Sequence, residues 1–395
     1  MLDFEFYAPT RVFFGKGAEM KVAEAVKWAG GSRVLLVYGI ASAKKSGLID
    51  CVEAQLNEAG IPFDSVSGVR PNPRLSLARE GIKKAEAFGA DLILAIGGGS
   101  SIDTAKAIAL GAANPGKDIW DFWLAKELPQ KVLPVGVILT IAATGSETSY
   151  SSVLTDDETL QKRGFNNDIN RPKFALMNPE LTFNLPINQL SNGIADIMLH
   201  TLDRYFTEKT GNDFTDALGE LVLRSVMDIG PKLLKAPNDY HLLSELMWCG
   251  SVSHNNLTGL GGIADFSVHA LSYPLSGIYD IAHAPALTAV WGSWAEYVMP
   301  ADPGRFAKLG REVFGDDNDY AALEDAALAA ISQMVEFFKS INMPTDFSSV
   351  GVGVLSDEVV QDFADYCSYN GGRKIGNFRP VDRDDIYEIF KMANK

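Results

Sequence analysis

The sequence predicts an α/β fold in its first half and an all-α fold in its second half. In the first half, short apolar runs alternate with stretches of helical period. In the second half, apolar residues recur every three or four positions and no run resembles a strand. The chain of 395 residues is too long for one ordinary core, so we expect two domains, 1–186 and 187–395.

Four apolar runs in the first half predict the strands of a parallel sheet. They are Val34–Tyr38, Asp91–Ile96, Val135–Leu139 and Phe174–Met177. Stretches of helical period lie at about 41–59, 74–89 and 101–113. This alternation is typical of a twisted parallel sheet that is covered by helices, with right-handed crossovers. Near Thr10–Gly15 the sequence predicts a small hairpin.

Helical periodicity begins beyond Pro186, a residue type that can start a helix. The apolar positions within 213–229 and within 323–338 recur at intervals of three and four residues. Such spacing places the apolar side chains of each helix on one face, toward a core. We therefore expect a helical second domain and place the boundary at Leu185–Ile187.

Composition limits the possible partners and compartments. The chain has 35 basic and 50 acidic residues, a formal net charge of -15, which repels nucleic acid and anionic membranes. Its three cysteines, far apart and without a CxxC pair, predict neither a disulfide framework nor a thiolate zinc site. The N-terminus lacks a signal-peptide pattern, and the apolar stretch Val132–Ala143 is too short to span a bilayer. We expect a cytoplasmic protein without a membrane anchor.

A glycine-rich turn follows the predicted strand at 91–96. Gly97, Gly98 and Gly99 lack Cβ atoms, and the helix that follows offers unpaired N–H groups and the positive end of its dipole. These features favour the binding of a diphosphate. The alternative is a tight turn in which Ser100 and Asp103 form only a capping box. The GxGxxG spacing of a standard dinucleotide fold is absent.

The first strand-to-helix turn, Gly39–Lys45, bears on the choice of cofactor. NAD-selective sites usually place a carboxylate against the ribose 2′-hydroxyl, and no acidic residue lies between Val37 and Ser46. Gly39, Ser42 and a lysine of this turn are suited to hold a 2′-phosphate. This favours NADP, with NAD as the second choice. A solvated loop with surface lysines is the competing interpretation.

Aspartate and histidine residues of the second half form a candidate metal site. Asp196 and His200 stand four residues apart, so a helix presents both on one face, although such a pair is more often a surface ion pair. His269 and His283 lie among apolar residues, where an imidazole needs a partner, either a carbonyl oxygen or a cation. One carboxylate and three imidazoles suit Fe²⁺ or Zn²⁺. The remaining histidines are assigned structural roles: His241 and His254.

With these motifs in this order, the chain resembles the iron-containing (group III) alcohol dehydrogenases, a metal-dependent family, and in particular its NADPH-dependent butanol dehydrogenase-like members. The resemblance runs nearly end to end. It is carried by Pro9–Gly17, Pro71–Pro73, Gly97–Lys106, Ala143–Glu147, the Asp196/His200 pair, His269 and Tyr279–His283.

The resemblance implies a dehydroquinate synthase-like architecture, in which a Rossmann-like N-terminal domain and a helical C-terminal domain flank the active site. It implies four metal ligands on which catalysis depends: Asp196, His200, His269 and His283. It also implies a set of cofactor contacts: Gly97, Gly98, Gly99, Ser100, Asp103, Thr140, Thr144 and Lys162. The implied reaction is hydride transfer between NADP and a small alcohol or aldehyde, with a divalent cation as Lewis acid. Homodimers are common in this family.

Of the departures from the family pattern, one concerns the proton route, and three rival functions remain. Many members carry a second histidine four residues after His269; here that position is Tyr273, which leaves the proton route open. A sugar-phosphate cyclase of the same architecture needs Lys and Arg residues around the metal, which the segments near Asp196 and His283 nearly lack. The intact Asp196/His200 pair argues against a glycerol-type dehydrogenase. The last rival is a non-catalytic protein that binds a cofactor or a metal.

Overall fold

A six-stranded sheet with the strand order β1-β8-β5-β4-β2-β3 forms the core of the first half of the chain. In the computed structural model, which describes residues 1–39, 46–183, 185–207 and 211–395, every neighbouring pair in this sheet is parallel. Its strands are β1 (Arg11–Phe14), β2 (Val34–Gly39), β3 (Phe63–Val69), β4 (Leu92–Gly97), β5 (Val135–Leu139) and β8 (Phe174–Met177). The four predicted strands are confirmed, and β3 joins them.

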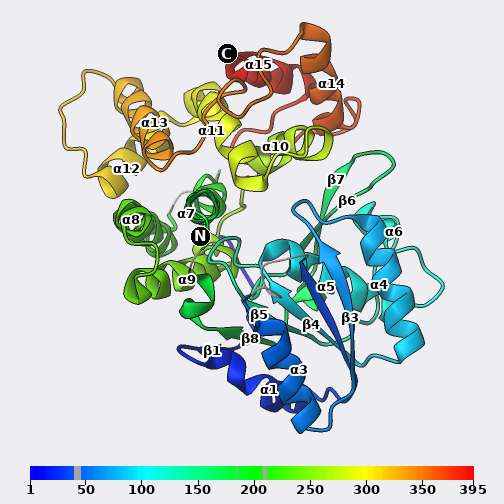
Figure 1. The fold of residues 1–395 in the computed structure, drawn as a ribbon. Helices are drawn as coiled ribbons and strands as arrows, with labels where there is room; N and C mark the ends of the chain where they lie inside the picture. Colours follow the sequence, from blue (N-terminus) through cyan, green and yellow to red (C-terminus); the bar gives the residue numbers. More distant parts are fainter. Residues whose placement is uncertain (40–45, 184, 208–210) are drawn as a thin grey trace. The chain divides into compact units, whose positions relative to one another are not determined.

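Helices cover both faces of this sheet (Figure 1). α1 (Val22–Trp28) and α3 (Leu48–Glu58) share one apolar core with β2 and β4. α4 (Leu75–Phe88) and α5 (Gly99–Ala113) pack against each other and form a second core with α6 (Trp120–Trp123). The chain moves outward from β2 to β3 and then back across β2 to β4. Right-handed crossovers therefore place α3 and α4 on opposite faces.

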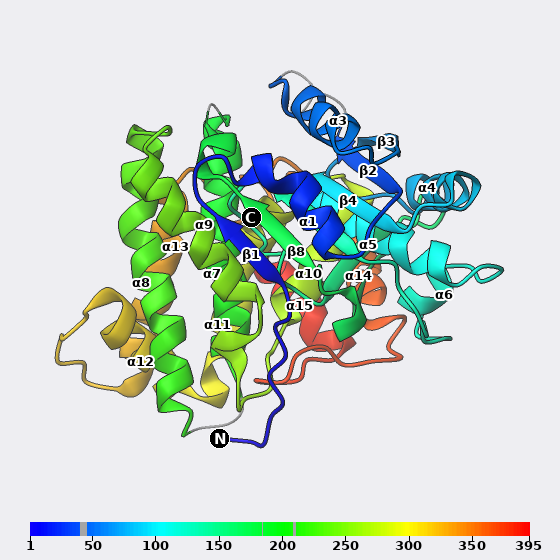
Figure 2. The same cartoon turned by 90° about the horizontal axis from the view of Figure 1, so that it is seen from below.

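The predicted hairpin near Thr10–Gly15 is wrong. β1 is instead the edge strand of the sheet and pairs in parallel with β8, beside which it lies in Figure 2, with Arg11 opposite Phe174. This partner lies far along the chain, so no local turn signal reveals it. The structure has an antiparallel hairpin elsewhere, formed by β6 (Ser151–Thr155) and β7 (Lys162–Asn166), which the sequence analysis missed.

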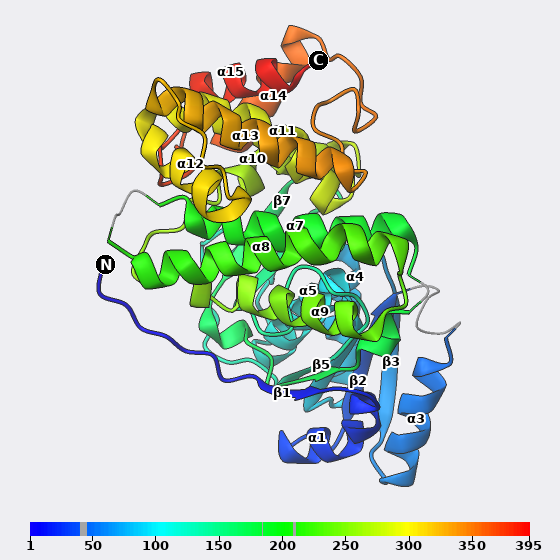
Figure 3. The same ribbon diagram turned by 90° about the vertical axis from the view of Figure 1, so that its left-hand side faces the viewer.

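The second half of the chain is helical, as predicted. Its helices are α7 (Ile187–Tyr205), α8 (Asp213–Lys235), α9 (Tyr240–His254), α10 (Ser267–Ile278), α11 (His283–Val298), α12 (Pro303–Leu309), α13 (Leu323–Ser340), α14 (Asp357–Ser368) and α15 (Arg383–Ala393). Long helices α7 and α8 lie side by side (Figure 3), and α7 also packs against α11. From residue 191 on, nearly every described residue of α7 is buried.

The chain divides into two compact units. The sheet unit contains Tyr7–Leu185 together with Asn238–Ser251, and the helical unit contains Met1–Phe6, Pro186–Pro237 and Val252–Lys395. Most of α9 thus belongs with the sheet unit. Its helical periodicity predicts a helix but does not show with which unit the helix packs. The first residues belong with the helices, where the N–H of Leu2 donates to the carbonyl oxygen of Gly261 (2.8 Å). Of the helices described, none combines the length and the apolar character needed to cross a membrane.

A buried lysine on α5 fixes the segment between β5 and β6. The ammonium group of Lys106 donates to the carbonyl oxygens of Ser146 (2.8 Å), Ser149 (3.1 Å) and Ser151 (2.7 Å). Burial lowers the pKa of Lys106 to about 8, and two nearby carboxylates, Asp103 and Glu147, oppose this shift. The lysine therefore connects one helix to a turn-rich segment that has little regular structure of its own.

We expect Lys106→Met to lower the free energy of unfolding by about 3–5 kcal/mol, because it removes the cation from two nearby carboxylates, of which Glu147 is buried, and the donor from three carbonyl oxygens. Lys84→Met is the matched control. Lys84 also donates to a carbonyl oxygen, that of Ser65, but its side chain is 40% exposed, so we expect a loss of less than about 1 kcal/mol. Urea unfolding measures both, and equal losses would contradict the role of Lys106.

Candidate functional site

Helix α7 presents Asp196 and His200 on one buried face. The helix begins after Pro186, and its apolar residues pack against α8 and α11. The four-residue spacing places Oδ1 of Asp196 3.6 Å from Nε2 of His200. Asp196 is 4% exposed and His200 is 3% exposed. The pair is therefore a core feature and not the surface ion pair that this spacing more often indicates.

Two further helices supply His269 and His283. The backbone N–H of Ser267, the first residue of α10, donates to the carboxylate of Asp265 (2.8 Å), and this contact holds the turn that precedes His269. His283 is the first residue of α11, and its Nε2 lies 3.9 Å from Oδ1 of Asp196. His269 is buried, whereas 26% of the His283 side chain is exposed.

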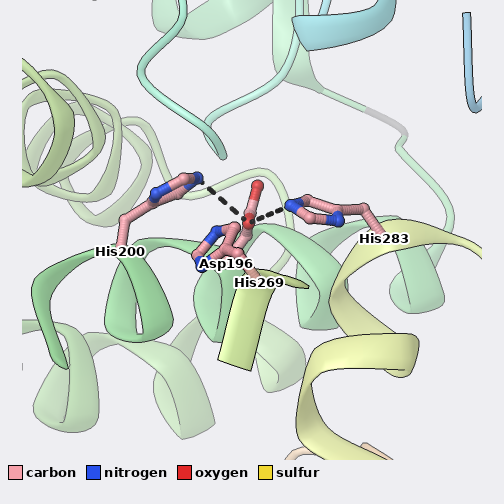
Figure 4. A group of neighbouring side chains, drawn as sticks. All are labelled: Asp196, His200, His269 and His283. Carbon is pink, nitrogen blue, oxygen red and sulfur yellow. Dashed lines mark ion pairs between the residues drawn. The ribbon is translucent and has the colours of Figure 1, made fainter. Parts of the chain in front are cut away.

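The four side chains converge on one point (Figure 4). One ligand-type atom from each of Asp196, His200, His269 and His283 lies within 4.8 Å of the others. Among the described residues, Nε2 of His200 and Nε2 of His269 are buried and find no hydrogen-bond partner. A buried polar atom in this state costs about 1–3 kcal/mol unless a donor or a cation satisfies it. One carboxylate and three imidazoles therefore fit a divalent Fe or Zn ion.

Two outer contacts orient these rings, and the sequence analysis missed both. The carboxylate of Asp203 contacts Nδ1 of His269, and Nδ1 of His254 lies 2.9 Å from Nδ1 of His200. Asp203 follows His200 by three residues on α7, so the sequence alone indicates that both side chains lie on the same face of the helix. His254, which we had assigned a structural role, comes from a distant segment and carries no such signal.

Burial keeps the candidate site's central histidine neutral. It lowers the pKa of His200 well below the usual value, and the nearby rings of His254 and His269 and the guanidinium of Arg204 act in the same direction. A neutral imidazole is the form that donates a lone pair to a metal ion. The neutral state of His200 and the convergence of the four side chains thus both favour the binding of a metal ion.

The glycine turn between β4 and α5 has the backbone that a phosphate site requires. Gly97 has a φ of 152°, which favours glycine, and Gly98 is the N-cap of α5 without a side-chain cap. The capping box considered for Ser100 and Asp103 is therefore wrong. The carboxylate of Asp103 instead accepts from the N–H of Val153 (3.0 Å). The N–H of Ser101 already donates to the carbonyl oxygen of Gly98 (3.0 Å), so the N–H groups of Gly99 and Ser100 and the dipole of α5 are the features suited to an anion.

The segment that follows β5 closes on this turn. The N–H of Thr140 donates to the carbonyl oxygen of Gly97 (3.1 Å). A Cβ atom added at Gly99 would lie 2.8 Å from Oγ1 of Thr144, so only glycine permits this approach. The structure thus brings together the predicted residues of the turn and the two predicted threonines.

In the described part of the chain, the structure gives no such contact with the glycine turn for the three other predicted cofactor residues. Gly39 ends β2, which pairs in parallel with β4, so Gly39 and Gly97 lie at the same edge of the sheet. Ser42 lies outside the described residues. Lys162, on β7, is buried and donates to the side-chain oxygen of Asn72 (2.9 Å).

Comparisons with known proteins agree with this arrangement. The sequence profile described as "Iron-containing alcohol dehydrogenase" matches residues 9–179. The profile described as "Fe-containing alcohol dehydrogenase family, C-terminal" matches residues 191–394. The two profiles together span nearly the whole chain, and the resemblance stated from the sequence motifs is confirmed.

Individual relatives match over their full lengths or nearly so. NADH-dependent butanol dehydrogenase A of Clostridium acetobutylicum is 39% identical over 394 residues, with 100% of both chains covered. The NADPH-dependent aldehyde reductase YqhD of Escherichia coli is 31% identical, over 89% of this chain and 90% of that protein. The crystal structure of NADH-dependent butanol dehydrogenase A from Thermotoga maritima superposes with a TM-score of 0.94 at 31% identity, covering 100% and 99% of the two chains. The predicted fold class is confirmed, and the chain belongs to the iron-containing alcohol dehydrogenase family.

Proposed function

We propose that this protein is a metal-dependent alcohol dehydrogenase and aldehyde reductase that transfers a hydride between NADP(H) and a small primary alcohol or aldehyde, such as butanol or butanal. Membership of the family supports this class of oxidoreductase. The observation that carries the proposal is the convergence of one carboxylate and three imidazoles on one point. In this proposal, 1–186 form the cofactor-binding domain and 187–395 form the metal-binding domain.

The metal site is formed by Asp196, His200, His269 and His283. A bound Fe²⁺ or Zn²⁺ ion supplies Lewis acidity for the oxygen of the alcohol or aldehyde. The protein fixes the donor atoms, and burial excludes competing water from three of them. His283 is the most exposed of the four, which leaves one side of the cluster open to substrate. Tyr273 follows His269 by four residues on α10 and is the candidate for proton exchange with solvent.

The cofactor site is formed by the glycine turn and the segment that covers it. Its residues are Gly97, Gly98, Gly99 and Ser100 for the diphosphate, with Thr140, Thr144 and Lys162 for the inner half of the cofactor. Asp103 lies on α5 after the turn, and its carboxylate accepts hydrogen bonds from the N–H of Val153 on β6 (3.0 Å) and from the hydroxyl of Ser146 (2.8 Å). Backbone amides and the dipole of α5 hold the anionic diphosphate without requiring a basic surface.

We propose NADPH as the preferred cofactor. Gly39 ends β2 at the sheet edge that carries the glycine turn, and no acidic residue lies between Val37 and Ser46 to repel a 2′-phosphate. The relatives are divided on this property: the butanol dehydrogenase of C. acetobutylicum is named as NADH-dependent, and YqhD of E. coli as NADPH-dependent. The preference therefore needs its own measurement.

A homodimer in the cytoplasm completes the proposal. β1 is an edge strand and its Phe14 is 42% exposed, a combination that favours pairing with a second copy. The three cysteines are free, as is usual in a reducing compartment. Light scattering during size-exclusion chromatography tests the dimer, since the chain mass is 42.8 kDa. A monomer mass would refute it.

We expect butanal reduction to require a divalent metal ion. Dialysis against a chelator should abolish NADPH oxidation, and Fe²⁺ or Zn²⁺ should restore it. His269→Gln should lose bound metal, measured by elemental analysis, and should lose more activity than the 10–100-fold that is typical when an outer-shell partner is removed. His241→Gln, at an exposed position, is the control and should keep both properties. Metal bound without turnover of any aldehyde would instead favour a non-catalytic binding protein.

We expect Gly39→Asp to shift the ratio of kcat/KM for NADPH to kcat/KM for NADH toward NADH, by on the order of 100-fold, because a carboxylate repels the 2′-phosphate. The control is Gly39→Asn, which has nearly the same size without the charge. It is needed because a Cβ atom at this position would lie 3.3 Å from the carbonyl oxygen of Val69. A wild-type enzyme that strongly prefers NADH would overturn the proposed cofactor preference.

A further inference from the structure

We propose that His254 is a positioning residue for the metal site: it accepts a hydrogen bond from Nδ1–H of His200 and thereby directs Nε2 of His200 toward the cation. This inference rests on the proposed metal-binding function. His254 does not belong to the four converging ligands, and it is contributed by the C-terminal end of α9, far from α7 in the sequence.

The contact between the two rings is short and buried. Nδ1 of His254 lies 2.9 Å from Nδ1 of His200, within the range of a nitrogen–nitrogen hydrogen bond. The ring centroids are 4.0 Å apart and the ring planes are inclined by 70°. Both residues are 3% exposed, so little water competes for either nitrogen. One of the two nitrogens must therefore carry the proton of this bond.

Arg204 determines which nitrogen carries the proton. Its Nη2 lies 3.4 Å from Nδ1 of His254, and a guanidinium group donates hydrogen bonds but cannot accept them. Nδ1 of His254 is therefore an acceptor whose single lone pair is shared between the nearer His200 (2.9 Å) and the more distant Arg204 (3.4 Å), and the proton of the histidine pair belongs to Nδ1 of His200. The guanidinium is held in place because its Nη1 donates to the carbonyl oxygen of His200 (2.9 Å) and because it lies over the ring of Phe266.

This assignment leaves the lone pair of His200 on Nε2, the nitrogen that faces the cluster. Nε2 of His200 lies 3.6 Å from Oδ1 of Asp196 and is buried without a hydrogen bond in the described part of the chain. His269 shows the same arrangement, with Nδ1 against the carboxylate of Asp203 and Nε2 buried without a hydrogen bond. Two ligand rings thus each have an outer acceptor on Nδ1, which fixes the tautomer and the ring orientation.

The two outer acceptors differ in charge. Asp203 and Asp196 are both buried carboxylates on α7, and a further anion against His200 would add to the negative charge buried on this helix. A neutral imidazole accepts the same proton without adding charge. The pair formed by His254 and Arg204 therefore orients His200 while keeping the anionic charge of the site low.

The Zn²⁺ affinity of metal-depleted protein, measured by competition with a chromophoric chelator in the absence of cofactor and substrate, tests the proposal. We expect His254→Leu, which removes the acceptor, to weaken Zn²⁺ binding by roughly 10–100-fold. His254→Asn, whose side-chain oxygen can accept the same bond, should restore most of the affinity. His241→Leu is the control on the same helix and should bind as the wild type does. Equal affinity for His254→Leu and the wild type would overturn the proposal.

A second measurement reads the tautomer in the unmutated chain, and a variant serves only to assign the signals. Long-range ¹H–¹⁵N spectra of Zn²⁺-loaded protein labelled at its histidine rings report the tautomer of each ring, and a His200→Asn variant identifies the signals of His200. We expect the proton on Nδ1 and the metal on Nε2; the reverse arrangement would exclude the proposed role. If wild-type protein binds no Zn²⁺, the proposed metal site and this inference both fail, whereas normal binding with the wrong tautomer refutes only the inference.

Discussion

The buried carboxylate of Asp196 is the constraint on which the site depends. A carboxylate in a low-dielectric interior is strongly unfavourable unless a counter-charge or several donors compensate it. Its nearest ring neighbours are those of His200 and His283, and burial favours the neutral form of His200. Neutral rings that present lone pairs cannot balance a negative charge, whereas a divalent cation satisfies the carboxylate and the lone pairs together. Binding of a divalent cation, the chemistry proposed for this protein, would therefore also make the burial of Asp196 favourable.

Helix α7 organises this arrangement because it supplies two of the proposed ligands and two of the outer contacts. Asp196 and His200 face the cluster, Asp203 reaches the ring of His269, and Arg204 sets the role of His254. These residues fall within little more than two helical turns, so one rigid element fixes their relative positions. Packing of α7 against α8 and α11 immobilises it in turn. A displacement of this helix would therefore disturb ligands and supporting contacts at the same time.

Local periodicity made part of this structure predictable. The alternation of apolar runs and helical stretches indicated the parallel sheet, and the four-residue spacing of Asp196 and His200 indicated one shared face. Features that depend on distant pairing were not predictable in this way. β1 finds its partner β8 only in the folded sheet, and His254 reaches His200 only through the path of α9. A single histidine in a helical sequence does not show which ring it contacts, because that contact is set by packing between helices.

At the glycine turn, the local backbone field matters more than the net charge of the chain. This difference explains how so acidic a protein could bind an anionic cofactor there. At a net charge of -15 the surface repels polyanions, but salt screens such charges beyond about 8 Å at physiological ionic strength. At the turn itself, the local field comes from the amides and the dipole of α5. A Cβ atom at residue 99 would lie 2.8 Å from Oγ1 of Thr144, so glycine at that position allows this close approach without displacing Thr144. Repulsion of nucleic acid by the surface and the proposed binding of a diphosphate at the turn are compatible, because the first depends on the whole surface and the second on one helix terminus.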